Sequence, residues 1–62
     1  MTAIEYYRRK KNIKQYEFAE MMGVTQQTMS LWENQHITPT VDRYKQMGKL
    51  LSVEWTELTK EI

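Results

Sequence analysis

Apolar residues recur every three or four positions along most of this chain, which is the spacing of helices that bury one face. The pattern predicts helices over about residues 3–11, 15–22, 26–34 and 41–51, and a fifth helix from about residue 54 onward. No segment alternates apolar and polar residues as a half-buried strand would. The sequence therefore predicts an all-α fold of five short helices.

Residues at the predicted boundaries are those that begin and end helices. Thr2, Thr25 and Thr40 each stand just before a predicted helix, where a side-chain oxygen can accept a free backbone N–H. Asn12 and Gly23 each follow a predicted helix and can take the left-handed conformation that ends one. The boundaries are thus supported independently of the apolar spacing.

The apolar stripes define the expected core. They comprise Ile4 and Tyr7; Phe18, Ala19 and Met22; Met29 and Trp32; Val41, Tyr44, Met47, Leu50 and Leu51; and Trp55, Leu58 and Ile62. We expect Met29 and Trp32 to belong to the core and not to a binding surface. The last stripe suits the core of the domain itself, a contact with a second copy or a contact with a different partner protein, and the sequence leaves all three open.

Two of the predicted helices are separated by only Gly23-Val24-Thr25, so that residues 15–34 have the spacing of a helix-turn-helix. The glycine permits a sharp turn, Val24 can fill the angle between the helices, and the small Ala19 permits close packing. In such a motif the second helix, here about residues 26–34, enters the DNA major groove. The simpler alternative is a helical hairpin without a ligand.

Charge is unevenly distributed, although the net charge is only +1. Basic residues gather near residue 10 and again near residue 45, while residues 15–34 hold three acidic residues and no basic one. Two basic clusters on either side of a polar segment suit a pair of contacts with a polyanion. A solvated surface is the alternative explanation for each cluster.

Composition excludes several classes of protein and site. The absence of cysteine excludes disulfides and thiolate zinc sites, and the single histidine, His36, excludes a multi-histidine metal site. No apolar run approaches a membrane span, and the N-terminus lacks the order of a signal peptide. We expect one cytoplasmic domain over residues 1–62, complete as given, without a membrane segment, cofactor, metal or small-molecule ligand. No phosphate loop or nucleophile–base pair indicates an enzyme.

From Arg8 to Leu58 the chain resembles the Cro/repressor helix-turn-helix family, also called the xenobiotic response element family. The residues that carry the resemblance are Gln15, Ala19, Gly23-Val24-Thr25, Thr28, Trp32-Glu33-Asn34, Pro39 and Leu51-Ser52-Val53. The resemblance implies a lambda-repressor-like fold and a dimer on a pseudo-palindromic operator. The segment Thr25-Gln26-Gln27 is similar to that of lambdoid phage repressors and Cro proteins. Gln35 and Ser52 stand where the family usually has glycine.

The predicted helix over about residues 26–34 is called the recognition helix below. Its exposed side holds the candidate base contacts, which are Gln26, Gln27, Ser30 and Leu31. A glutamine amide can form two hydrogen bonds with adenine, and a leucine can contact a thymine methyl. Solvated glutamines and a singly exposed leucine are the alternatives.

The candidate phosphate contacts combine the basic clusters with positions that the family uses. They are Arg8, Lys11, Lys14, Gln15, Asn34, His36, Arg43 and Lys45. For His36, Arg43 and Lys45 a plain solvated side chain is an equal alternative. The resemblance also implies that Arg8 pairs with Glu33 and so holds the recognition helix in place.

These observations predict a sequence-specific regulator of transcription that binds double-stranded DNA. The resemblance favours a Cro-like repressor of phage or prophage type that binds its operator as a homodimer. The homodimer could form before DNA binding or only on the DNA. The alternative is a protein-interaction module on the same fold, such as an antitoxin or a co-regulator.

Overall fold

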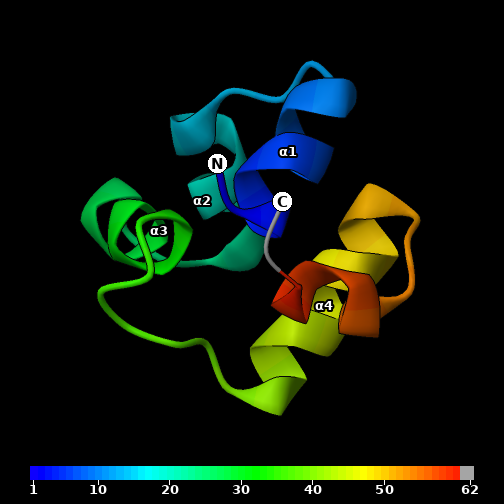
Figure 1. The fold of residues 1–62 in the computed structure, drawn as a ribbon. Helices are drawn as coiled ribbons and strands as arrows, with labels where there is room; N and C mark the ends of the chain where they lie inside the picture. Colours follow the sequence, from blue (N-terminus) through cyan, green and yellow to red (C-terminus); the bar gives the residue numbers. More distant parts are fainter. Residues whose placement is uncertain (61–62) are drawn as a thin grey trace.

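A computed structural model describes residues 1–60 as four α-helices and a closing 3-10 helix (Figure 1). The elements are α1 (Ala3–Lys10), α2 (Gln15–Met22), α3 (Gln26–Glu33), α4 (Val41–Leu51) and η1 (Trp55–Thr59). The described residues contain no strand, and the predicted all-α class is confirmed. The observed α-helix boundaries lie within one residue of those predicted.

The fifth predicted helix forms as a 3-10 helix and not as an α-helix. Glu54 precedes it without a side-chain cap, and the backbone N–H of Glu57 donates to the Glu54 carbonyl at 3.0 Å. The Thr59 hydroxyl donates to the Thr56 carbonyl at 2.8 Å, a local bond that competes with a regular helix. A segment of five residues also gains too few backbone bonds to offset the cost of starting an α-helix.

The predicted caps are present. Side-chain oxygens of Thr2, Thr25 and Thr40 accept the backbone N–H three residues on, at 3.4, 3.1 and 3.3 Å. Asn12 and Gly23 both adopt left-handed backbone conformations, with φ of 58° and 74°. The three threonine oxygens accept N–H groups that the start of a helix leaves without an intrahelical acceptor. The left-handed residues end the helices that precede them.

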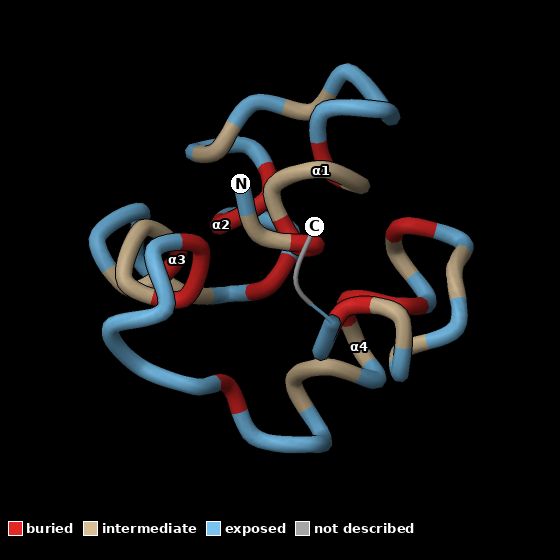
Figure 2. Tube along the Cα trace, viewed as in Figure 1, coloured by how far each residue is buried: buried red, intermediate tan, exposed pale blue. Residues whose placement is uncertain are grey.

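One apolar core joins all five elements, and Figure 2 shows its buried segments facing the middle of the molecule. It consists of Ile4, Phe18, Ala19, Met22, Met29, Trp32, Met47, Leu51 and Leu58. Met29 and Trp32 are core residues, as predicted. Leu58 is also buried here, whereas Ile62 of the same predicted stripe lies outside the described residues. Val41 was expected in the core stripe but is 51% exposed, because it begins α4 at the edge of the molecule.

Gly48 determines how η1 closes the domain. It lies inside α4, where a Cβ atom would stand 2.8 Å from the Val53 carbonyl oxygen and 3.1 Å from the Trp55 nitrogen. The Gly48 carbonyl also accepts a hydrogen bond from the Val53 N–H at 3.0 Å. The absence of a side chain therefore lets residues 53–55 pass directly against α4 before η1 begins.

The arrangement leaves α3 at one side of the molecule. Figure 1 shows it at the left, beside α2, and residues 34–40 lead from it as a long loop to α4. The molecule measures 23 × 23 × 22 Å. None of the helices within residues 1–60 is long and apolar enough to cross a bilayer.

Candidate nucleic-acid interface

The turn between α2 and α3 is closed by backbone hydrogen bonds. The Val24 N–H donates to the Ala19 carbonyl at 3.0 Å, and the Gly23 N–H donates to the Glu20 carbonyl at 3.1 Å. With Gly23 left-handed, these bonds form the usual glycine-dependent end of a helix. Thr25 then caps α3 at once, so three residues separate the two helices.

The face of α3 that points away from the core is polar at its beginning. Gln26 and Gln27 are exposed, whereas Ser30 and Leu31 are half-buried. Leu31 is therefore less accessible than the expected exposed leucine, because the chain folds back and the His36 and Ile37 N–H groups bond to its carbonyl. The four candidate base contacts share one side of the helix, with the glutamines most open to a ligand.

A chain of side-chain hydrogen bonds supports this face from behind. Gln26 Nε2 donates to Gln15 Oε1, and Gln15 Nε2 donates to Glu33 Oε1, both at 3.3 Å. The first residue of α2 is thereby linked to the first and the last residue of α3. Gln26 retains its carbonyl oxygen and one N–H, which are the groups that an adenine edge requires.

Arg8 and Glu33 form the buried end of this chain. Arg8 Nε and Nη2 donate to the two carboxylate oxygens of Glu33 at 2.7 and 3.0 Å, and Arg8 Nη1 donates to the Ile13 carbonyl at 2.8 Å. The side chains are only 9% and 2% exposed. All three nitrogens of the guanidinium are thus used within the molecule. This geometry favours a role in holding α3, and a phosphate contact by Arg8 stays a prediction.

The remaining phosphate candidates differ in accessibility. Lys11, Lys14, Asn34, His36 and Lys45 are exposed, and Gln15 and Arg43 are half-buried. At the start of α2, Glu17 Oε1 accepts the Lys14 N–H at 3.0 Å, while the next N–H groups have no intrahelical acceptor. Free N–H groups at the positive end of a helix dipole suit a phosphate, and Gln15 and Lys14 adjoin them.

Two further predicted phosphate contacts, Lys45 and Arg43, belong to α4. Lys45 lines a hollow of about 580 Å³ between α4 and η1, together with Lys49 and Trp55 and without any residue of α3. Arg43 Nη1 donates to the Met22 carbonyl at 3.1 Å, a contact that no pattern in the sequence predicts. This hydrogen bond joins two residues that lie 21 positions apart in the sequence.

Within residues 1–60, two pKa shifts occur away from the exposed face of α3. Burial raises the pKa of Tyr44 in α4. A hydrogen bond from Lys60 to the Glu57 carboxylate raises the pKa of that exposed lysine.

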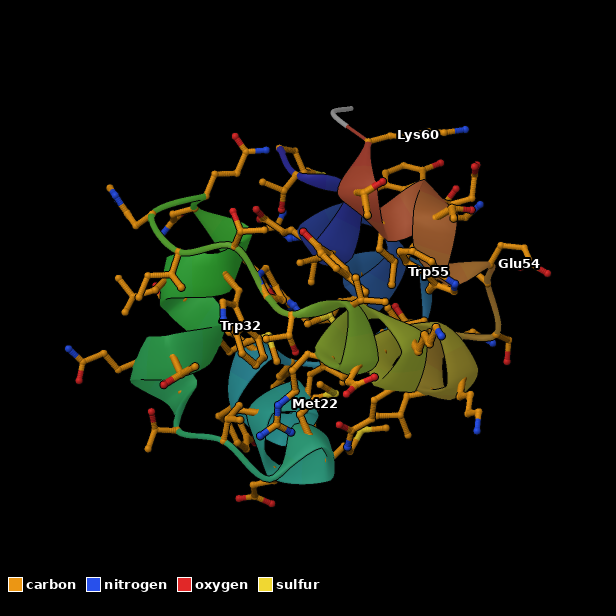
Figure 3. All side chains as sticks on the ribbon, turned by 90° about the horizontal axis from the view of Figure 1, so that it is seen from below. Met22, Trp32, Glu54, Trp55 and Lys60 are labelled. Carbon is orange, nitrogen blue, oxygen red and sulfur yellow. The ribbon has the colours of Figure 1, made fainter. Side chains whose placement is uncertain are left out.

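Tyr44 and Trp32 line a second hollow of about 400 Å³ beside the loop that follows α3. Figure 3 shows Trp32 between α3 and α4, where it supports the recognition helix from within.

Comparison with known proteins agrees with this geometry. A family model described as helix-turn-helix matches residues 4–58, which is most of the chain and covers α2, α3 and α4 in full and most of α1 and η1. No match was found among curated proteins or among solved structures. The order of elements, the three-residue turn and the family match lead to one conclusion: the chain belongs to the Cro/C1-type helix-turn-helix family of DNA-binding regulators.

Proposed function

We propose that the protein recognises a specific double-stranded operator by placing α3 in the major groove. The observation that carries this proposal is the exposed pair Gln26 and Gln27 at the start of α3, supported by Gln15 and the buried Arg8–Glu33 pair. Major-groove edges differ among all four base pairs, and glutamine amides suit adenine. Ser30 and Leu31 extend the same face for a further polar contact and a thymine methyl.

Phosphate contacts would position this helix without selecting the sequence. The proposed set is the start of α2 with Lys14 and Gln15, the nearby Lys11, and Asn34 and His36 after α3. These residues come before and after the recognition helix along the chain, and that order supports a clamp across the groove. Lys45 remains a weaker member of the set, because it lies beside η1.

The active form that we propose is a homodimer on a pseudo-palindromic site. Recognition helices of such dimers lie about 34–36 Å apart, one turn of DNA. Each copy measures about 23 Å in every direction, so two adjacent copies can span that distance. A net charge of +1 provides little non-specific attraction, and doubling the groove contacts would compensate for it.

Repression is the sign of regulation that we propose, because a small domain seated on an operator blocks access to the DNA beneath it. The cytoplasm and a phage or prophage origin are proposed with it, the latter on the Thr25-Gln26-Gln27 resemblance. Selection of bound sequences from a random duplex pool tests the proposal. We expect enrichment of two related half-sites about one helical turn apart. Failure to enrich any site at moderate salt and high protein concentration would favour the antitoxin or co-regulator alternative.

A further inference from the structure

We infer that Arg43 is a positioning residue that holds the carboxyl end of α2 and thereby sets the direction in which the turn delivers α3. This inference assigns Arg43 a role different from phosphate contact, and its consequence for DNA rests on the proposed function. Together with Arg8, it gives the recognition helix a support at each end, one from α1 and one from α4.

Arg43 makes its side-chain hydrogen bonds to other parts of the protein through one nitrogen, Nη1. Its Nη1 donates to the Met22 carbonyl at 3.1 Å and to Gln46 Oε1 at 3.2 Å, which uses both N–H groups of that nitrogen. Met22 is the last residue of α2 and is buried, and Figure 3 shows it where α2 meets α4. Arg43 is itself half-buried, and its backbone N–H is fixed by the cap at Thr40.

The carbonyl that Arg43 binds is one that the helix leaves free. The last carbonyls of a helix have no intrahelical donor, and the turn provides donors for only some of them. Gly23 and Val24 donate to the carbonyls of Glu20 and Ala19. Among the described residues, no backbone N–H beyond α2 donates to the Met22 carbonyl. The guanidinium of Arg43 donates the hydrogen bond that this carbonyl accepts.

Charge adds a second reason for an arginine here. The carboxyl end of a helix carries partial negative charge, which a nearby cation stabilises. The last turn of α2 has no basic residue and contains Glu20, which adds to the negative charge. Arg43 brings the missing cation from α4, a helix that otherwise makes limited contact with α2.

Fixing Met22 has a direct effect on α3, because only Gly23, Val24 and Thr25 separate Met22 from Gln26. A shift at the Met22 carbonyl would pass through this closed turn to the first residue of the recognition helix. Gln26 and Gln27 lie at that end, so their placement on a base edge depends on it. A lost phosphate contact would have a different signature, since it weakens all sequences alike.

The first test needs no DNA. Amide hydrogen exchange is measured at Gly23 and Val24 in Arg43→Met, Arg43→Lys and the control Lys45→Met, under conditions where each variant is folded by circular dichroism. Arg43→Met should accelerate exchange at both amides by about tenfold, the effect of losing one charge-assisted hydrogen bond. Arg43→Lys should restore part of the protection, and Lys45→Met should leave it unchanged. If Arg43→Met does not fold, Arg43→Lys decides: faster exchange than in Lys45→Met supports the inference, and equal rates overturn it.

The second test uses the selected operator and a range of salt concentrations. A lost phosphate contact lowers the slope of log affinity against log salt by about 0.9. Arg43→Met should leave the slope unchanged and reduce the ratio of specific to non-specific affinity several-fold. A reduced slope with unchanged exchange rates would overturn the inference. If the wild-type protein selects no DNA, the proposed function fails, while the exchange measurement still decides whether Arg43 holds the turn.

Discussion

Arg8 and Glu33 are joined by two parallel hydrogen bonds of 2.7 and 3.0 Å, and both side chains are almost fully buried. This pair connects α1 to the last residue of the recognition helix. Gln15 donates to the same carboxylate, so the helix that would lie against the phosphates shares the anchor. The orientation of α3 is therefore tied to the interior of the domain and not only to its flanking loops.

Removing one member of this pair should be severely destabilising. Arg8→Ala leaves a buried carboxylate without its cation, which typically costs about 3–5 kcal/mol. A domain of this length has a total stability of only about 3–9 kcal/mol. We expect Arg8→Ala to be largely unfolded by circular dichroism at 37 °C and to unfold at much lower urea concentration.

Arg9→Ala is the matched control for this prediction. Arg9 pairs with Glu5 at 2.7 Å on the surface of the same helix, with 62% of the arginine side chain exposed. Exposed pairs contribute about 0–1 kcal/mol. Similar urea midpoints for Arg8→Ala and Arg9→Ala would contradict the proposed role of the buried pair.

The hydrogen bond between Gln15 and Gln26 should appear as coupling in DNA binding. If Gln15 orients Gln26 for a base edge, Gln15→Ala and Gln26→Ala should not be additive in operator affinity. We expect a coupling energy of about 0.5–1.5 kcal/mol, the net contribution of one hydrogen bond. Fluorescence anisotropy of the two single variants and the double variant measures it. Additive losses within about 0.3 kcal/mol would show that the two glutamines act independently.

Glycine should be favoured at two positions where the chain lacks it. Gln35 and Ser52 have φ of 61° and 59°, a left-handed conformation that disfavours residues with a Cβ atom. Gln35→Gly and Ser52→Gly should each raise the free energy of unfolding by up to about 1 kcal/mol, measured by urea titration. Lys45→Gly, in the exposed interior of α4, should instead lower it by about 1 kcal/mol. Destabilisation by both loop substitutions would show that their side chains matter more than backbone strain.

A methyl group at Gly48 should disrupt the closure by η1. Alanine normally favours a helix interior, but its Cβ would lie 2.8 Å from the Val53 carbonyl oxygen. We expect Gly48→Ala to lower the free energy of unfolding by about 1–3 kcal/mol, as overpacking does. The neighbouring Lys49→Ala, on the exposed side, should change it by less than about 0.5 kcal/mol. A thermal unfolding series distinguishes them, and an unchanged or higher midpoint for Gly48→Ala would mean that residues 53–55 can move aside.

The local structure of this chain was predictable because its signals are local. Thr25 caps α3 and Gly23 ends α2 through contacts within a few residues, which the sequence alone displays. The 3-10 form of η1 was not predicted, since apolar spacing does not distinguish short helix types. The partners of Arg43 and Gln26 were not predicted either, because they depend on how packed helices bring distant residues together. The resemblance to the family supplied the Arg8–Glu33 pairing in advance.

The central claim is that α3 selects the DNA bases, while residues outside its exposed face bind the phosphates of the DNA backbone. Repeating the random-duplex selection with Gln27→Ala and Lys11→Ala tests it most directly. The account predicts that Gln27→Ala loses preference at one position of each half-site. Lys11→Ala should enrich the same sequence with uniformly weaker affinity and a salt slope lower by about 0.9. Enrichment of an unchanged sequence, with unchanged discrimination, by Gln27→Ala and by a Gln26→Ala variant would contradict the claim.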